Sequence, residues 1–159
     1  MTRKAMGRSL RAALFVCGLA SPLAAQDLLI VETREGTVLG QLEFDEGHEI
    51  CLSWFHSVTG GDVSDCFENR ADRLVLTRSF LHDFAAGLGE VAGRGTLVSA
   101  KGGGYWIEGI NEAMPDNALM LRVGALRVGH ILRGGSEQLD LSTRAAGKRV
   151  TLRLVPQQP

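Results

Sequence analysis

The distribution of glycine is the feature that most limits how this chain can fold. Eighteen of the twenty glycines lie after residue 26, and they separate short runs rich in Val, Leu, Ile and Phe. Glycine readily adopts the positive φ of tight turns, and short apolar runs between such turns are typical of β-strands. No apolar period of 3.6 residues persists over three turns, so no long amphipathic helix is expected.

These apolar runs predict an all-β fold. The expected strands span residues 27–33, 37–44, 48–58, 63–70, 73–79, 95–100, 105–110, 118–123, 126–132, 138–142 and 149–155. Short strands at this spacing predict a single antiparallel domain of about ten strands, and both a β-sandwich and a small barrel stay open. Residues 81–93 have room for one helical turn, but Gly87 and Gly89 argue against a longer helix.

Residues 1–25 have the composition of a secretory signal peptide. Four Lys or Arg side chains precede the apolar run 12–20, and small residues then lead to an expected cleavage site after Ala25. The alternative is an uncleaved membrane anchor, but the apolar run is about half the ~20 residues that a spanning helix requires. We therefore expect a periplasmic or otherwise exported protein with a β domain over 26–155 and a disordered tail over 156–159.

Composition limits the partners of the mature chain. Removal of the signal peptide leaves thirteen Lys and Arg against eighteen Asp and Glu, with no dense basic run. An acidic protein of this kind has no electrostatic affinity for phosphate backbones, so nucleic acid is not expected as a partner. The four histidines show no spacing typical of a metal site, and no glycine-rich segment matches a phosphate-binding loop. We therefore expect no metal, no cofactor and no integral membrane segment after cleavage.

The segment 50–67 carries the first candidate site. Alternation places five side chains on one strand face: Ile50, Leu52, Trp54, His56 and Val58. If Gly60 and Gly61 are the two central turn residues, facing residues have numbers that sum to 121, and His56 then lies opposite Asp65. This register predicts a buried or half-buried pair, which either hydrogen bonds for structural reasons or forms a ligand or proton-relay site.

The same register bears on the two cysteines of the mature chain. It offsets Cys51 from Cys66 by four residues, or about 13 Å, whereas a disulfide needs Cα atoms within about 7 Å. The alternative is a turn centred on Val58 and Thr59, which would place the cysteines opposite each other. Disulfides form in oxidising compartments, so the expected export of the protein favours a bridge between the two cysteines. The turn at Gly60 and Gly61 argues against it.

Catalytic patterns are weak. Ser57 follows His56 directly, but adjacent strand residues point to opposite faces, so these two do not form a nucleophile and base. A small-ligand binder or an enzyme would instead use His56 and Asp65 as acid and base, with Arg122 or Arg127 binding an anion. The lack of a clear nucleophile, metal motif or cofactor loop favours a non-catalytic role over an enzyme.

The residues also resemble a known family. Residues 53–58, Ser-Trp-Phe-His-Ser-Val, followed by Val63 and Asp65, are similar to the His-Ser-Val signature of the domain of unknown function 1850 family of small exported bacterial proteins. Residues 84–89 look like its glycine-rich loop, and 121–124 with His130 look like its C-terminal strands. Ser57, Arg122 and His130 are therefore secondary candidates beside the predicted pair.

The resemblance implies a role beside a transporter. Genes of that family are commonly found next to TAXI-type TRAP transporters, which import small organic solutes, and no enzymatic activity is established for the family. It therefore implies an accessory or interaction module whose partner is a TRAP transporter subunit or solute-binding protein. A periplasmic ligand binder or enzyme and a purely structural envelope protein stay open as alternatives.

Overall fold

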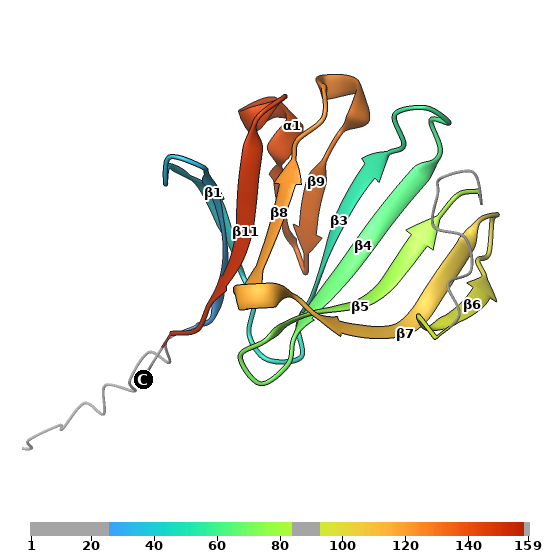
Figure 1. The fold of residues 1–159 in the computed structure, drawn as a ribbon, viewed down its shortest axis with the longest axis horizontal. Coiled ribbons are helices and arrows are strands. Elements are labelled where there is room, and N and C mark those ends of the chain that lie inside the picture. The colour runs from blue at the N-terminus through green and yellow to red at the C-terminus, as the bar shows by residue number, and fades with distance from the viewer. Residues whose placement is uncertain (1–25, 84–92, 158–159) are drawn as a thin grey trace, which may run out of the picture.

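The computed structural model describes residues 26–83 and 93–157, which form two antiparallel β-sheets (Figure 1). The expected signal peptide, the glycine-rich segment 84–89 with most of the possible helical turn, and the last two residues of the expected tail lie outside the described residues. None of the described helices has both the length and the apolar character needed to cross a lipid bilayer.

The smaller sheet has four strands in the order β2-β1-β11-β8. Its strands are β1 (Leu28–Thr33), β2 (Val38–Glu43), β8 (Ala118–Arg122) and β11 (Arg149–Val155). The larger sheet has seven strands in the order β10-β9-β3-β4-β5-β7-β6. Its strands are β3 (Glu49–Phe55), β4 (Asp62–Asn69), β5 (Leu74–Leu81), β6 (Thr96–Ser99), β7 (Tyr105–Ala113), β9 (Ile131–Gly134) and β10 (Glu137–Asp140).

The main hydrophobic core lies between the two sheets. Alternating residues of β1 and β11, such as Val31 and Leu152, pack in one cluster with Ile50 and Leu52 of β3, and all four are almost fully buried. Burial of the inward residues of both sheets is the arrangement of a β-sandwich. The all-β prediction is therefore confirmed, and of the two open architectures the sandwich is the observed one, because neither sheet of the described residues closes into a barrel.

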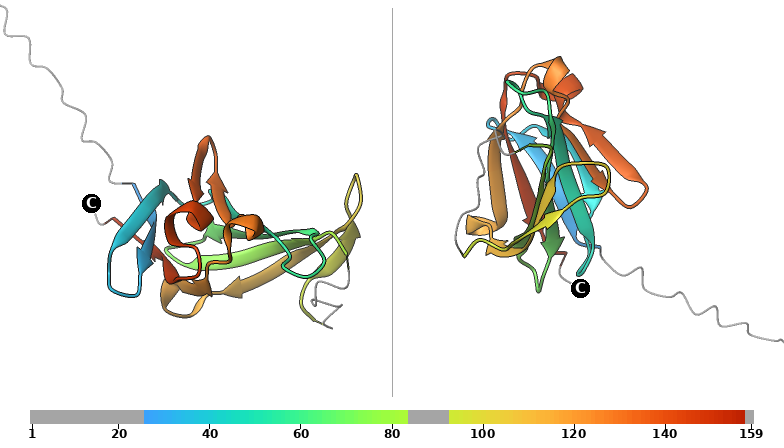
Figure 2. Two further views of the ribbon diagram at one scale, coloured as in Figure 1. Left: turned by 90° about the horizontal axis from the view of Figure 1, so that it is seen from above. Right: turned by 90° about the vertical axis from the view of Figure 1, so that its right-hand side faces the viewer.

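The two sheets overlap only in part. The four-stranded sheet lies at one end of the molecule, whereas β5, β7 and β6 extend towards the other end (Figures 1 and 2). There a second, smaller cluster forms from Val63, Leu81 and Ile107, with Trp54 packed against both clusters. The overhanging end therefore has less apolar packing than the end where the sheets face each other.

Two predicted strands are replaced in part by helical turns. Residues 126–132 contain the 3-10 turn η3 (Leu126–Val128), which Gly129 ends with a φ of 62° before β9 begins. Residues 138–142 leave the strand at Asp140, whose carboxylate accepts the Thr143 N–H at 3.0 Å and caps the short helix α1 (Leu141–Ala145). A further turn, η2 (Pro115–Asn117), precedes β8. Local capping and left-handed glycine geometry therefore override the apolar pattern at these points.

Candidate functional site

The register of the β3–β4 hairpin differs from the prediction. Cys51 lies opposite Cys66, Leu52 opposite Asp65 and Trp54 opposite Val63, so the numbers of facing residues sum to 117. The predicted register with a sum of 121 is wrong. The turn is a longer loop over residues 56–61, in which Gly60 has a φ of 73°. The two glycines lie at one end of this loop instead of forming its centre.

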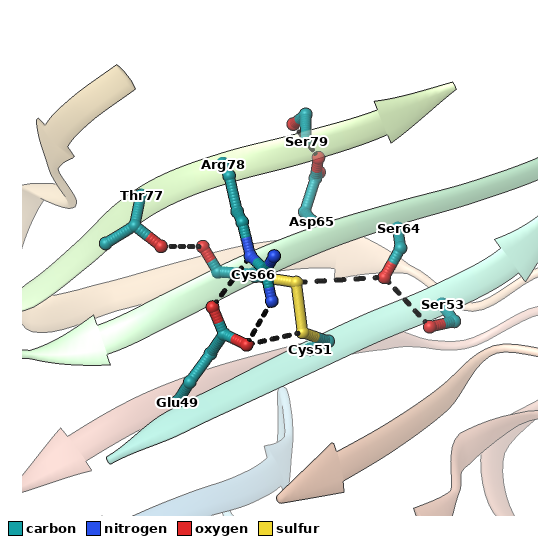
Figure 3. Close-up of a disulfide and its surroundings, with 9 residues drawn as sticks. All are labelled: Glu49, Cys51, Ser53, Ser64, Asp65, Cys66, Thr77, Arg78 and Ser79. Carbon is teal, nitrogen blue, oxygen red and sulfur yellow. Dashed lines mark hydrogen bonds and ion pairs between the residues drawn. A yellow bond between two sulfur atoms is a disulfide. The ribbon is translucent and has the colours of Figure 1, made fainter. Parts of the chain in front are cut away.

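A disulfide joins Cys51 to Cys66 across the hairpin (Figure 3). Their Cα atoms are 4.0 Å apart, so the expectation of two distant cysteines is wrong and the open alternative is the observed one. Hydrogen bonds from His56 N–H to the Gly61 carbonyl and from Gly60 N–H to the His56 carbonyl, both 2.8 Å, close the loop. The loop therefore holds the glycines without placing them inside a strand.

His56 and Asp65 do not form the predicted pair. His56 belongs to the loop, where its Nδ1 accepts the Thr59 N–H at 3.2 Å. Asp65 lies on the core face of β4 and accepts a hydrogen bond from the Ser79 hydroxyl. Burial raises the pKa of Asp65, while the hydrogen bond from Ser79 and the charge of Arg94 act in the opposite direction. The predicted acid–base relay is therefore not assembled.

His130 is a buried histidine that stacks on Trp54. The two ring centroids are 5.6 Å apart and the planes differ by 14°. Nδ1 of His130 accepts the Gly124 N–H at 3.2 Å, and burial lowers the pKa of the imidazole. Both features favour the neutral ring. His130 therefore fastens the segment after η3 to β3.

The other two predicted site residues lie elsewhere. Ser57 is exposed in the 56–61 loop. Arg122 ends β8 on the outward face of the four-stranded sheet, directly opposite Arg149 of β11. The predicted site residues are His56, Ser57, Asp65, Arg122 and His130. The structure does not bring them together in one place.

A polar network that the sequence analysis missed covers the outward side of the disulfide. Glu49 receives two hydrogen bonds from Arg78, at 2.6 and 2.9 Å, and the Arg78 guanidinium carbon lies 4.4 Å from the centroid of the Trp106 ring. Figure 3 shows Arg78 and Glu49 beside the disulfide. The hydrogen bond with Glu49 raises the pKa of Arg78 above its usual value. Strand alternation could have put Arg78 on this face, but only the sheet order places it beside Glu49 and Trp106.

The neighbourhood of the disulfide contains potential metal ligands. In the described part of the chain, Glu49 and the two cysteines bring one ligand atom each within 4.8 Å of one another. Metal binding by cysteine requires the thiolate, and both sulfurs are committed to the disulfide. This cluster is therefore a structural crosslink with an adjacent ion pair.

Three large apolar side chains are exposed where strand β3 ends. They are Phe55, Val58 and Leu126, and we call them the apolar tip. Their exposed fractions are 50%, 86% and 66%. Phe55 ends β3 and lies beside Gly129, where an added Cβ would be 3.6 Å from its Cδ2. Figure 1 shows the β3–β4 loop and the connection between β8 and β9, which contains η3, at the same end. The predicted register would have placed Val58 within a strand, and the longer loop exposes it instead.

Comparisons with known proteins assign the family. No curated protein and no solved structure matches the chain. A family model described as Domain of unknown function (DUF1850) matches residues 50–141, which include both disulfide cysteines, the apolar tip and His130. This chain therefore belongs to the DUF1850 family.

Proposed function

We propose that this DUF1850 protein is an exported, non-catalytic interaction module that acts with a TAXI-type TRAP solute importer. It docks on a transporter subunit or on the solute-binding protein through the apolar tip. The observation that carries this proposal is a hydrogen-bonded loop that holds Val58 in water, with Phe55 and Leu126 exposed at the same end.

The energetics of the apolar tip favour a binding surface. Large apolar side chains gain about 25 cal/mol for each Å² removed from water, and clustered exposed ones are typical of interaction sites. The 56–61 loop is held by its own contacts, which include a hydrogen bond from Gly61 N–H to the Thr59 hydroxyl at 3.3 Å. A loop ordered before binding loses little conformational entropy when the partner docks.

Two observations support export. Residues 1–25 have the composition of a signal peptide, and the Cys51–Cys66 disulfide suits an oxidising compartment. The importer as partner rests on the family resemblance. The alternative of an enzyme that uses His56 and Asp65 as acid and base loses its geometric support, because the two side chains belong to the loop and to the core face of β4.

Site-specific cross-linking tests the proposal. A photoreactive amino acid is placed at position 58 of the full-length gene, which is expressed in the native host together with its transporter. We expect a covalent adduct with a TRAP subunit or with the solute-binding protein. Position 38 is the matched control, because Val38 is also an exposed valine, with an exposed fraction of 55%, but lies on β2 of the other sheet. It should give no such adduct.

A second variant separates docking from folding. Val58→Asp introduces a charge into the apolar tip and should abolish recovery of the transporter with the protein. The unfolding midpoint should stay close to that of the wild type, because Val58 is exposed. Adducts of equal yield from positions 38 and 58, or adducts only with proteins outside the transporter, would contradict the proposed role.

A further inference from the structure

The outward face of the four-stranded sheet is basic, although the whole chain has a formal net charge of -1. A concavity of about 700 Å³ on this face is lined by Arg34, Arg122, Arg149 and Arg153, which we call the arginine face, with Glu32 as the acid among its lining residues. Small-ligand sites have volumes of roughly 300 to 1,000 Å³. The concavity therefore has the size of a small-molecule site.

Strand pairing brings two of these guanidinium groups together. Arg149 of β11 lies directly opposite Arg122 of β8. Like charges in directly opposed positions destabilise a sheet. In the described part of the chain, an ion pair joins Arg153 to Glu32 at 3.4 Å, but no such pair neutralises Arg122 or Arg149. The fold therefore keeps a repulsive pair that an anion from solution would relieve.

The charges at this end of the sheet leave a positive surplus. Arg34 lies in the turn that follows β1, and the adjacent Glu35 is exposed. The pKa of Glu35 is lowered by a hydrogen bond from the backbone, then by one from Thr33, and further by the charges of Lys148 and Arg34. Glu35 is thus ionised at neutral pH, but its single negative charge does not balance the cations around it.

The same concavity has an apolar part. Met120 of β8 is 83% exposed and lies opposite Thr151 of β11, two residues along each strand from the Arg122 and Arg149 pair. Two strand residues span about 6.6 Å, so a short aliphatic chain that starts at the arginine pair can cover the Met120 side chain. Guanidinium groups bind carboxylates through paired N–H donors. A carboxylate with an aliphatic chain therefore fits this face better than a bare inorganic ion.

We infer that the arginine face binds a small aliphatic carboxylate. The carboxylate lies between Arg122 and Arg149, and the carbon chain runs along the strands over Met120. This site lies on a different sheet from the hairpin that carries Phe55 and Val58. The inference is therefore independent of the proposed transporter docking.

Calorimetric titration with hexanoate tests the inference, with protein purified from cells that express the full-length gene. We expect saturable binding that Arg122→Gln and Arg149→Gln each weaken about tenfold or more, because each variant loses a charge-assisted hydrogen bond to the carboxylate. Arg73→Gln is the matched control. It removes the same charge from an exposed arginine in the β4–β5 turn and should leave hexanoate binding unchanged.

The aliphatic chain has a test of its own. Acetate carries the same charge as hexanoate but has no chain to cover Met120, so it should bind the wild type more weakly. Met120→Ser should weaken hexanoate binding towards the level of acetate and leave acetate binding unchanged, because only the chain contacts this side chain. Equal affinity of the wild type for acetate and hexanoate would overturn the inference.

Thermal unfolding without ligand distinguishes a lost site from a damaged fold. Removal of one charge of the opposed pair should leave the unfolding midpoint unchanged or raise it, since the repulsion is relieved. Three further results would overturn the inference: no saturable hexanoate binding, equal weakening by Arg73→Gln, or inorganic phosphate binding as tightly as hexanoate and displacing it. Val58→Asp should bind hexanoate normally even if it abolishes transporter docking.

Discussion

The Asp65 carboxylate lies on the core face of the seven-stranded sheet, where Ser79 donates a hydrogen bond to it and burial disfavours its charge. The His130 ring is also buried, accepts the Gly124 N–H and is kept neutral by desolvation. The charge of one side chain does not stabilise the other. These two polar groups therefore contribute to the stability of the fold, and their titration should be measurable as a pH dependence of the free energy of unfolding.

The protonation of Asp65 predicts a pH dependence. Its pKa in the folded state lies above the ordinary value of 3.8, so the folded protein binds the proton more tightly than the unfolded chain does. The contribution of Asp65 to the free energy of unfolding is fully present below its pKa in the unfolded chain. It is lost as the pH rises through its pKa in the folded protein. Asp65→Asn keeps an acceptor for Ser79 but does not titrate. Urea unfolding should therefore show the wild type losing stability relative to this variant as the pH rises from the unfolded pKa through the folded one.

A constant difference in the free energy of unfolding across this pH range would mean that Asp65 has the same pKa in both states. Ser79→Ala is the complementary variant, because it leaves the buried carboxylate without its donor. It should cost about 1 to 3 kcal/mol at neutral pH, which the same unfolding measurement detects.

The β3–β4 hairpin shows how an element settles its register. The sums of 121 and 117 correspond to a shift of four residues, an even number, so every side chain keeps its sheet face in both registers. Alternation alone therefore cannot distinguish the two arrangements. The observed one pairs Cys51 with Cys66 and Ser53 with Ser64, whose hydroxyl oxygens lie 2.9 Å apart. Covalent and polar cross-strand contacts thus decide what the apolar pattern leaves open.

The disulfide should contribute strongly to the stability of this element. Its two cysteines are separated by 15 residues in the sequence, and closing a loop of that length stabilises the folded state by about 3 kcal/mol at 25 °C in the chain-entropy model. The double variant Cys51→Ala with Cys66→Ala should lose this amount in urea unfolding at neutral pH. A reducing agent should lower the stability of the wild type and leave that of the double variant unchanged. Equal stability of the two proteins under oxidising conditions would contradict the expectation.

The uneven overlap of the sheets governs the behaviour of the whole molecule. The main cluster joins residues of both sheets, whereas the overhanging end relies on Val63, Leu81 and Ile107. Among the described strands, β6 forms the edge of the larger sheet at the overhanging end and is mostly exposed. Regions with few buried contacts open locally at low free energy. The overhanging end should therefore be the first part of the sandwich to open.

Native-state hydrogen exchange checks this expectation. Amides of β6 that bond to β7 should exchange through local opening, at a lower free energy than amides of β1 and β3, which should exchange only through global unfolding. Urea should then accelerate exchange in β1 and β3 much more than in β6, because global unfolding exposes more surface. Equal protection and equal urea dependence in all three strands would show that the two ends unfold as one unit.

The order of strands along the chain follows from local sequence, because apolar alternation and glycine turns act over a few residues. The all-β class, the strands β1 and β11 and the core face of Asp65 are determined at this level. The apolar pattern does not predict the helical turns over 126–128 and 141–145, since a left-handed Gly129 and the Asp140 cap decide their conformation.

Only the tertiary structure decides which strands become neighbours and in what register. It brings Arg122 to Arg149 and Arg78 to Trp106, and it moves His56 into a loop away from Asp65. These contacts join residues distant in sequence, or depend on even-numbered shifts that leave the alternation pattern intact. No local period carries that information, so the surfaces proposed for binding emerge only once the sheets are assembled.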